Sequence, residues 1–317
     1  MNPEDSCALQ VGPDGRLRHL LTLQGLGRDR IEALLDEAVR LRGAMQTDMP
    51  PQPLRGRTII NLFFEPSTRT RLSFELAARR LGGEVLNFDL ASSSSCKGES
   101  LHDTLATLEA MQADAVIVRH KENGTPTELA RVSRRAAILN AGDGNHAHPT
   151  QGLLDALTIR DRHPDLSCLN VTICGDIRHS RVARSDIHVL RALGVRQLRL
   201  CAPRALLPTA DSVPGCELGE DFDAAIEGSD VIIMLRLQRE RMQDAPLARE
   251  ADYFSDYGLD SARLRRAAPD ALVMHPGPLN RGVEISDAVA DGPQSVILDQ
   301  VANGIPVRMA ALTTLLT

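Results

Sequence analysis

Residues 61–75 read Asn-Leu-Phe-Phe-Glu-Pro-Ser-Thr-Arg-Thr-Arg-Leu-Ser-Phe-Glu and join two predicted elements. The run from Arg57 to Phe64 is rich in β-branched and aromatic residues, which predicts a short buried strand. Beyond the hinge, apolar residues recur at helical spacing and predict a helix that ends at Gly82-Gly83: Leu72, Phe74, Leu76, Ala77 and Leu81. The stretch is therefore a strand, a polar hinge and a helix in direct succession.

The hinge, Pro66 to Arg71, gathers groups that bind anions. It places three hydroxyls, two guanidinium groups and the unpaired N–H groups of a helical first turn at one point. The helix dipole also favours negative charge there, so the hinge predicts a phosphate or carboxylate site. Arg69 and Arg71 lie two residues apart on roughly opposite helix faces, so only one is expected to hold the anion directly. The simpler alternative is that Ser67 or Thr68 only caps the helix.

Composition narrows the class of protein. With 317 residues, 43% of them apolar, the chain can form a sizeable core, and two domains are expected rather than one. A net charge of −6 argues against a general nucleic-acid binder. No apolar run reaches the roughly 18 residues of a membrane span, and the first 16 residues lack a signal core. Six scattered cysteines form no CxxC pair, which predicts reduced thiols in the cytoplasm and no metal site.

Strand and helix patterns alternate along the chain. Residues 1–20 are expected to be a tail or surface extension, and a helix is predicted from Arg28 to Met45. Two more helix starts are predicted, at Ser100 with Asp103 and at Thr125 with Pro126. Further strands are predicted at 84–88, 114–120, 136–142, 170–176, 197–203, 230–236 and 271–276, and a last helix at about 295–316. This order predicts an α/β protein with two doubly wound parallel-sheet domains, 1–150 and 151–294, joined near 148–163.

Polar residues follow six of these strands. In open parallel sheets, ligands bind beyond the carboxyl ends of the strands, where such residues gather. The six segments are 65–71, 119–120, 148–151, 178–184, 236–241 and 275–280. One such end would be an ordinary solvated loop, but six together favour a ligand site. The turn after Gly175 resembles a dinucleotide-binding turn, yet it lacks GxGxxG, so NAD binding has little support.

Five motifs occur in an order that resembles the aspartate and ornithine carbamoyltransferases, from about Arg55 to the end of the chain. They are Phe63-x-Glu65-x-Ser-Thr-Arg-Thr-Arg71, Lys97-x-Glu99, His148-Pro-Thr-Gln151, Arg236-x-Gln238 and His275-Pro-x-Pro-x-Asn-Arg-x-Val-Glu284. The fourth and fifth motifs point to the aspartate branch, because ornithine enzymes carry His-Cys-Leu-Pro in the last one. The resemblance also implies that the final helix, about 295–317, returns to the first domain.

For the first domain, the resemblance implies carbamoyl-phosphate binding. Arg119 matches the family residue that binds the carbonyl and phosphate groups. His148 matches the residue that donates a hydrogen bond to the carbonyl oxygen, and Gln151 matches the residue that orients the carbamoyl NH₂. The backbone carbonyls of Pro276 and Gly277 would hold that NH₂ and the attacking amine. The phosphate would lie on the hinge residues Ser67, Thr68, Arg69 and Thr70. Considered alone, His148 is more simply a structural histidine at a helix start, and the turn at 275–284 only a rigid one.

For the second domain, 151–294, the resemblance implies aspartate binding. Arg181 would hold the α-carboxylate, and Arg236 with Gln238 would hold the β-carboxylate, because paired N–H donors of Arg match a carboxylate. Glu65 would pair with Arg181 and Arg241 when the domains close. Without the resemblance, the charge run at 236–241 could be a solvated loop.

The serine-rich stretch Ser92–Ser100 is by composition a flexible linker. The resemblance implies instead a loop donated to the site of the neighbouring subunit, with Ser93 and Lys97 at the matching positions. The family unit is a homotrimer, so the site would be shared between subunits and a monomer would be inactive.

The expected activity is carbamoyl transfer from carbamoyl phosphate to L-aspartate, a step of de novo pyrimidine synthesis. The family needs no metal or organic cofactor, and the partners are small-molecule substrates. The segment before Arg28 could serve a regulatory chain or a dihydroorotase-like partner. The alternatives are a carbamoyltransferase for another amine such as ornithine or a modified ornithine, a non-catalytic α/β ligand-binding subunit, or a scaffold with an inactive site. Which group takes the proton of the amine stays open.

Overall fold

The strand that precedes the hinge, β1 (Thr58–Phe63), lies inside a four-stranded parallel sheet of order β2-β1-β3-β4. Its neighbours are β2 (Glu84–Asn87) and β3 (Ala115–His120), and β3 pairs in turn with β4 (Ala137–Asp143). The computed structural model describes residues 8–47, 50–88, 99–237 and 250–317. Every residue of β3 and β4 is buried, as expected for parallel strands covered on both faces.

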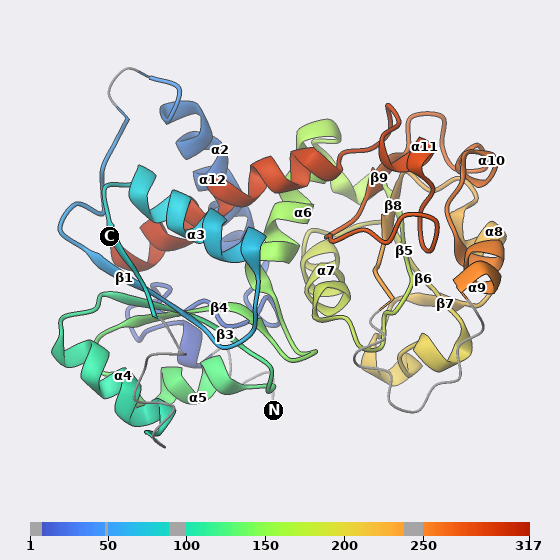
Figure 1. Cartoon of the computed structure of the whole chain (residues 1–317). Coiled ribbons are helices and arrows are strands. Elements are labelled where there is room, and N and C mark those ends of the chain that lie inside the picture. The colour runs from blue at the N-terminus through green and yellow to red at the C-terminus, as the bar shows by residue number, and fades with distance from the viewer. Residues whose placement is uncertain (1–7, 48–49, 89–98, 238–249) are drawn as a thin grey trace. The chain divides into compact units, whose positions relative to one another are not determined.

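Helices cover both faces of this first sheet (Figure 1). On one face lie α2 (Arg28–Ala44), α3 (Thr68–Arg80) and the C-terminal part of α12 (Ile297–Leu316). On the other lie α4 (Leu101–Ala110) and α5 (Thr125–Val132), which pack on Leu62, Val116 and Ile138 in one apolar cluster. The sequence predicted α2, and the apolar residues at helical spacing along it are buried: Ile31, Leu34, Leu35, Ala38 and Leu41.

The second sheet has five parallel strands in the order β7-β6-β5-β8-β9. The strands are β5 (Asn170–Cys174), β6 (Gln197–Cys201), β7 (Glu217–Gly219), β8 (Val231–Met234) and β9 (Leu272–Met274). The helices are α7 (Arg181–Ala192), α8 (Phe222–Ile226), α9 (Glu250–Tyr257), α10 (Ser261–Leu264) and α11 (Asp287–Ala290), with 3₁₀ turns at Leu166–Cys168, Arg204–Leu206 and Ala210–Ser212. Two parallel-sheet α/β units confirm the predicted fold class.

Two helices belong to both units. The first unit is Met1–Leu154 with Ala302–Thr317, and the second is Asp155–Val301, so α6 (Pro149–Arg162) and α12 each run from one unit into the other. In the first unit, Arg42 Nη1 donates to Asn303 Oδ1 at 2.8 Å, and the Arg308 guanidinium lies 5.0 Å from the centre of the Phe74 ring. The last helix therefore returns to the first unit, as predicted. Among the described residues, no helix is both long and apolar enough to cross a membrane.

The expectation that residues 1–20 form a tail or surface extension is wrong for His19 and Leu20, which are buried. Leu20 pairs in parallel with Leu139 of β4, and its N–H donates to Ile138 O at 3.0 Å. His19 is 2% exposed, and its Nδ1 accepts the Ile138 N–H at 2.9 Å. The segment thus extends the open edge of the first sheet and satisfies its backbone groups.

Two local predictions also need correction. Leu72 and Leu76 belong to the apolar pattern that predicted α3, but they are 47% and 44% exposed, because the face toward the sheet is made by Phe74, Ala77 and Ala78. Thr125 was expected to cap α5, yet Gly124 is the N-cap residue and the Thr125 hydroxyl lies 3.0 Å from His120 Nδ1. By contrast, the Ser100 Oγ accepts the Asp103 N–H at 3.1 Å, which confirms the predicted cap of α4.

Candidate active site

The hinge between β1 and α3 leaves the start of the helix open to a ligand. Ser67 is the N-cap residue and has an extended backbone, but within the described chain its side chain makes no capping hydrogen bond. The alternative in which Ser67 only caps α3 is therefore wrong. Thr70 is buried, whereas Arg69 and Arg71 are both exposed on the first turn. The N–H groups of this turn can thus face an anion, because no Ser67 cap occupies them.

Arg119 lies at the end of β3, beside the hinge. Phe63 of β1 is its partner in register, and the N–H of Phe64 donates to Arg119 O at 2.8 Å. The residue is only 8% exposed, and its Nη1 donates to Ala141 O at 3.0 Å. Its Nη2 lies 3.4 Å from Glu65 Oε1. The guanidinium is therefore fixed by neighbouring strand ends and presented at the carboxyl edge of the sheet.

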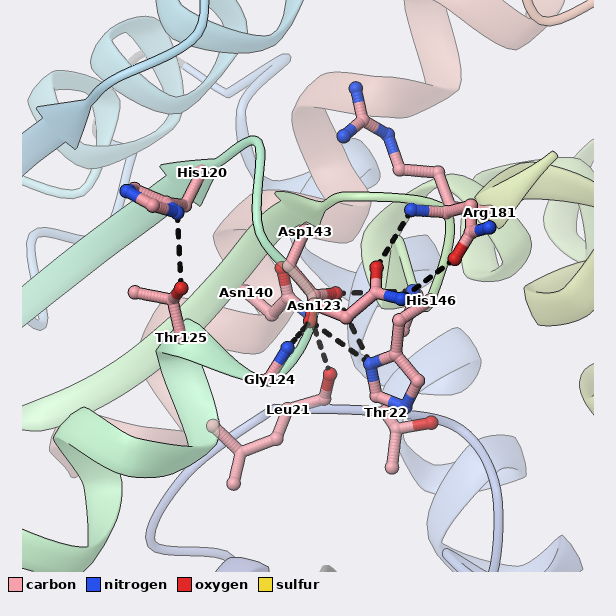
Figure 2. A network of polar contacts seen from close by, with 12 residues as sticks. Leu21, Thr22, His120, Asn123, Gly124, Thr125, Asn140, Asp143, His146 and Arg181 are labelled. Atoms are coloured by element: carbon pink, nitrogen blue, oxygen red, sulfur yellow. Dashed lines mark hydrogen bonds and ion pairs between the residues drawn. The ribbon is translucent and has the colours of Figure 1, made fainter. Parts of the chain in front are cut away.

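A buried carboxylate, that of Asp143 at the end of β4, accepts several hydrogen bonds at the same edge of the sheet (Figure 2). The sequence did not predict this role. Asp143 is fully buried and accepts hydrogen bonds from the Gly124 N–H at 2.7 Å and from Asn140 Nδ2 at 2.8 Å. It also lies 3.0 Å from His146 Nδ1 and accepts the Ala147 N–H at 3.1 Å. Burial raises the pKa of Asp143, but these hydrogen bonds outweigh it and lower the pKa. In the sequence, this role is indicated only by the position of Asp143 between a predicted strand and Gly144.

This carboxylate fixes the loop that leads to His148 and α6. His148 is 4% exposed, Thr150 is fully buried and Gln151 is 9% exposed. The N–H of Gln151 donates to His148 O at 2.9 Å, so the two residues are held by the same first turn. The edge of the first sheet thus carries Glu65, Ser67, Thr68, Arg69, Thr70, Arg119, His148 and Gln151 on neighbouring segments.

In the second unit, the predicted site residues that the structure describes come after three adjacent strands. Arg181 is the first residue of α7, after β5, and is 7% exposed. Arg236 follows β8, and Pro276 with Gly277 follows β9. The sheet order β5-β8-β9 places all of these at one edge, because parallel strands end on the same side.

Gly175 permits this close arrangement. Its φ is +124°, and a Cβ atom there would lie 2.6 Å from Leu235 O, so only glycine fits. The next residue, Asp176, is fully buried, and its Oδ1 lies 2.8 Å from His179 Nδ1. Ser180 Oγ then accepts the Ala183 N–H at 3.1 Å and caps α7. The loop is therefore ordered before the chain reaches Arg181, and Asp176 is a second organising acid that the sequence did not reveal.

Four predicted site residues lie outside the described residues: Ser93, Lys97, Gln238 and Arg241. The pairing of Glu65 with Arg181 and Arg241 stays a prediction. Among the described residues, no group of three or more His, Cys, Asp or Glu side chains could hold a metal ion.

The strand ends of these two parallel-sheet units carry arginines and a histidine, and the start of α3 is open. Such an arrangement is typical of α/β proteins that bind small anionic ligands. The family model for the carbamoyl-phosphate-binding domain of aspartate/ornithine carbamoyltransferases matches residues 18–161, and that for the Asp/Orn-binding domain matches residues 168–315. The chain belongs to the aspartate/ornithine carbamoyltransferase family.

Its relatives separate the two branches. The chain is 54% identical, over 98% of its length and 99% of the other, to the aspartate carbamoyltransferase catalytic subunit of Stenotrophomonas maltophilia. The structure of aspartate transcarbamoylase from Trypanosoma cruzi with carbamoyl phosphate and aspartate matches with a TM-score of 0.83 and 31% identity, over 95% of this chain and 97% of that one. Ornithine carbamoyltransferase from Pyrococcus furiosus matches with a TM-score of 0.85 but 28% identity, over 94% and 97%. The fold is thus common to both branches, and sequence identity favours aspartate.

Proposed function

We propose that this chain is an aspartate carbamoyltransferase: it transfers the carbamoyl group of carbamoyl phosphate to L-aspartate and releases N-carbamoyl-L-aspartate and phosphate. The product would serve pyrimidine synthesis. Two findings support the proposal: the 54% identity, over 98% of this chain, to an aspartate carbamoyltransferase catalytic subunit, and the complex of the T. cruzi enzyme with both substrates. The observation that carries it is the pairing of an open α3 start with a buried, fixed Arg119 at the edge of the first sheet.

In the first unit, we assign the phosphate to the hinge residues Ser67, Thr68, Arg69 and Thr70. Arg119 and His148 would donate to the carbonyl oxygen, and Gln151 would orient the carbamoyl NH₂. Donors aimed at an oxygen on which negative charge develops stabilise the transition state more than the ground state. The burial of Arg119 and His148 supports these roles, because a dry site strengthens such interactions.

In the second unit, we assign the α-carboxylate of aspartate to Arg181 and its β-carboxylate to Arg236 with Gln238. Each guanidinium can bind a carboxylate through two parallel N–H donors. The carbonyl groups of Pro276 and Gly277 would accept hydrogen bonds from the carbamoyl NH₂ and the amine. Arg181, Arg236 and this turn follow neighbouring strands, which supports their acting on one ligand.

The chemistry needs no covalent enzyme intermediate. The amine of aspartate attacks the carbonyl carbon, a C–N bond forms, and the C–O bond to phosphate breaks. One proton must leave the amine, and the departing phosphate is a base in the right place to accept it. Catalysis would then rest on holding two anions side by side and on stabilising the tetrahedral intermediate.

We further propose a homotrimer in which the segment 92–100 completes the site of a neighbouring subunit through Ser93 and Lys97. A pairing of Glu65 with Arg181 and Arg241 would accompany closure around the substrates. The exposed Leu72 and Leu76 on α3 support an association surface on the first unit. The free Cys174 and Cys201 thiols fit a reducing, cytoplasmic compartment.

Steady-state kinetics test the proposal. The wild-type chain should release phosphate from carbamoyl phosphate with saturable dependence on L-aspartate and form N-carbamoyl-L-aspartate, while ornithine stays inert. Arg236→Ala should lower kcat/KM for aspartate by about 100-fold, because a charge-assisted pair is lost. Arg204→Ala, an exposed arginine of the same unit, is the matched control and should change little. Turnover with ornithine but not aspartate would favour the other branch, and no turnover with either would reject the activity.

A further inference from the structure

A buried pair of side chains underlies the turn after β9. His275 and Glu284 are both fully buried as side chains, and His275 Nε2 lies 3.1 Å from Glu284 Oε1. The Nδ1 of the same ring accepts the N–H of Gly277 at 2.8 Å. A ring nitrogen that accepts a hydrogen bond carries no proton, so the ring is neutral and its proton lies on Nε2, facing the carboxylate.

Glu284 holds both ends of this turn. Its Oε1 also accepts the Asn280 N–H at 2.6 Å, so one carboxylate oxygen binds the His275 ring and the backbone five residues further on. At the start of the turn, the His275 N–H donates to Gln300 Oε1 at 2.9 Å, and Gln300 Nε2 donates to Asp155 Oδ1 at 2.6 Å. The enclosed residue Gly277 has a φ of +66°, a conformation that a side chain would disfavour. The backbone between His275 and Asn280 is thus fixed at three points.

Packing alone does not explain this arrangement. Burying a carboxylate is costly, and apolar side chains of similar volume commonly stabilise a fold as well or better. A carboxylate gives what apolar groups cannot, namely a single ring tautomer and a fixed direction for the Gly277 N–H and its neighbouring carbonyl groups. Carbonyl groups that bind a reacting amine need such fixed directions, because small displacements cost rate.

We propose that Glu284 is a positioning residue that holds His275 protonated at Nε2, and that His275 thereby fixes the Pro276 and Gly277 carbonyl groups for the carbamoyl and amine groups. The inference rests on the proposed function for its consequence in catalysis, but the state of the ring can be measured without activity.

The first measurement is ¹⁵N NMR of histidine-labelled, full-length protein, with the His275 signals assigned by their loss in His275→Asn. Wild type should show His275 protonated only at Nε2. Glu284→Ala should lose this single state, whereas Glu284→Gln should keep it, because a Gln oxygen can still accept both N–H groups. A wild-type ring protonated at Nδ1, or at both nitrogens, would overturn the inference.

The second measurement compares kinetics. Glu284→Ala should lower kcat/KM by about 10- to 100-fold, the range that a misplaced group commonly costs, with the inorganic phosphate Kd within about threefold of wild type. Glu284→Gln should remain within about threefold of wild-type kcat/KM, although it should unfold at a lower temperature. Its amide would replace Oε2, which has no hydrogen-bond partner among the described residues. Arg281→Ala, which breaks exposed ion pairs to Asp287 and Asp291 in the same loop, is the control and should stay near wild type.

The outcomes separate the two proposals. If wild type turns over aspartate and Glu284→Ala matches Glu284→Gln in kcat/KM, the positioning role is wrong and the proposed function stands. If wild type has no activity, the proposed function fails, and the spectra alone show whether Glu284 holds the ring. If Glu284→Ala does not fold, the ring state of wild type and the kinetics of Glu284→Gln still test the proposal. A Glu284→Gln variant that keeps the ring state but has a kcat/KM below one-tenth of the wild-type value would contradict positioning through His275.

Discussion

Arg119 and Glu65 form an ion pair across neighbouring strand ends, with Nη2 3.4 Å from Oε1. The Arg119 side chain is one-tenth exposed and that of Glu65 one-quarter, so the pair lies partly out of water. With Nη1 on Ala141 O, the guanidinium has a fixed direction before any substrate arrives. Such preorganisation is what stabilisation of a developing oxyanion requires.

Arg119→Lys should therefore lower kcat/KM by about 100-fold, because lysine cannot reproduce the planar fork of donors. Arg131→Lys, on the exposed surface of α5, is the matched control and should leave kcat/KM within about twofold. Steady-state assays over both substrates measure the effect. Near-normal kcat/KM in the Arg119→Lys variant would remove Arg119 from the proposed chemistry.

The proposed sharing of sites predicts complementation between inactive chains. Lys97→Ala and Arg119→Ala should each be nearly inactive alone. After mixing, unfolding and refolding together, roughly one quarter of the sites should combine an intact Arg119 with an intact Lys97 from a neighbour, so activity should return. Mixtures that stay as inactive as their parents, while forming trimers by light scattering, would contradict a shared site.

His19 predicts a loss of stability in mild acid. Burial, with a smaller contribution from Arg18, lowers its pKa from 6.5 to about 4. The unfolded chain takes up a proton near pH 6.5 while the folded chain resists it, so stability is full above pH 6.5 and falls toward pH 4. The loss should reach about 3 kcal/mol. In His19→Asn, whose Oδ1 can replace Nδ1 as acceptor for Ile138, this component should vanish. Urea unfolding between pH 4 and 7 measures it, and identical pH profiles for both proteins would contradict the assignment.

Asp186 predicts the opposite trend. Burial, with the neighbouring carboxyl of Asp155, raises the pKa of Asp186 well above its ordinary 3.8. The folded state therefore keeps a proton that the unfolded state releases, so this group costs the wild type stability as the pH rises above about 4. Asp186→Asn keeps the shape without the charge and should make the protein more stable than wild type at pH 8, with a smaller difference between the two at pH 4. Asp211→Asn, at an exposed position, is the control, and a destabilised Asp186→Asn would show that the carboxylate form is required.

The sequence predicted those parts of the fold in which local pattern and burial agree. β1, α2 and the strands β3, β4, β5, β8 and β9 are such parts, because their apolar residues are the buried ones. The three-residue strand β7 was not predicted, and Leu86 of the predicted strand β2 is exposed. The short helices α9, α10 and α11 were missed, since four to eight residues give no measurable period. Leu72 and Leu76 misled the prediction, because periodicity shows that a face is apolar but not what covers it.

The arginines of the site could be predicted from the sequence, but the buried carboxylates that order the neighbouring loops could not. Arg119 lies at the end of an apolar strand, and Arg181 and Arg236 come after apolar strands, a pattern visible in the sequence. Asp143 and Asp176 were not visible, because a single acid in a loop has no spacing that reveals its burial or its partners. The edge role of residues 19–21 was hidden for the same reason, since one short pairing with β4 leaves no repeating pattern.

The most direct test is calorimetric titration with N-(phosphonacetyl)-L-aspartate, a ligand found in a T. cruzi relative, which joins a phosphonate to an aspartate. We predict binding at least about 1,000-fold tighter than that of inorganic phosphate or succinate, because the two halves bind as one molecule. Arg69→Ala and Arg236→Ala should each weaken it by at least about tenfold. Binding no tighter than that of phosphate, and unchanged by Arg236→Ala, would contradict a site that holds both substrates.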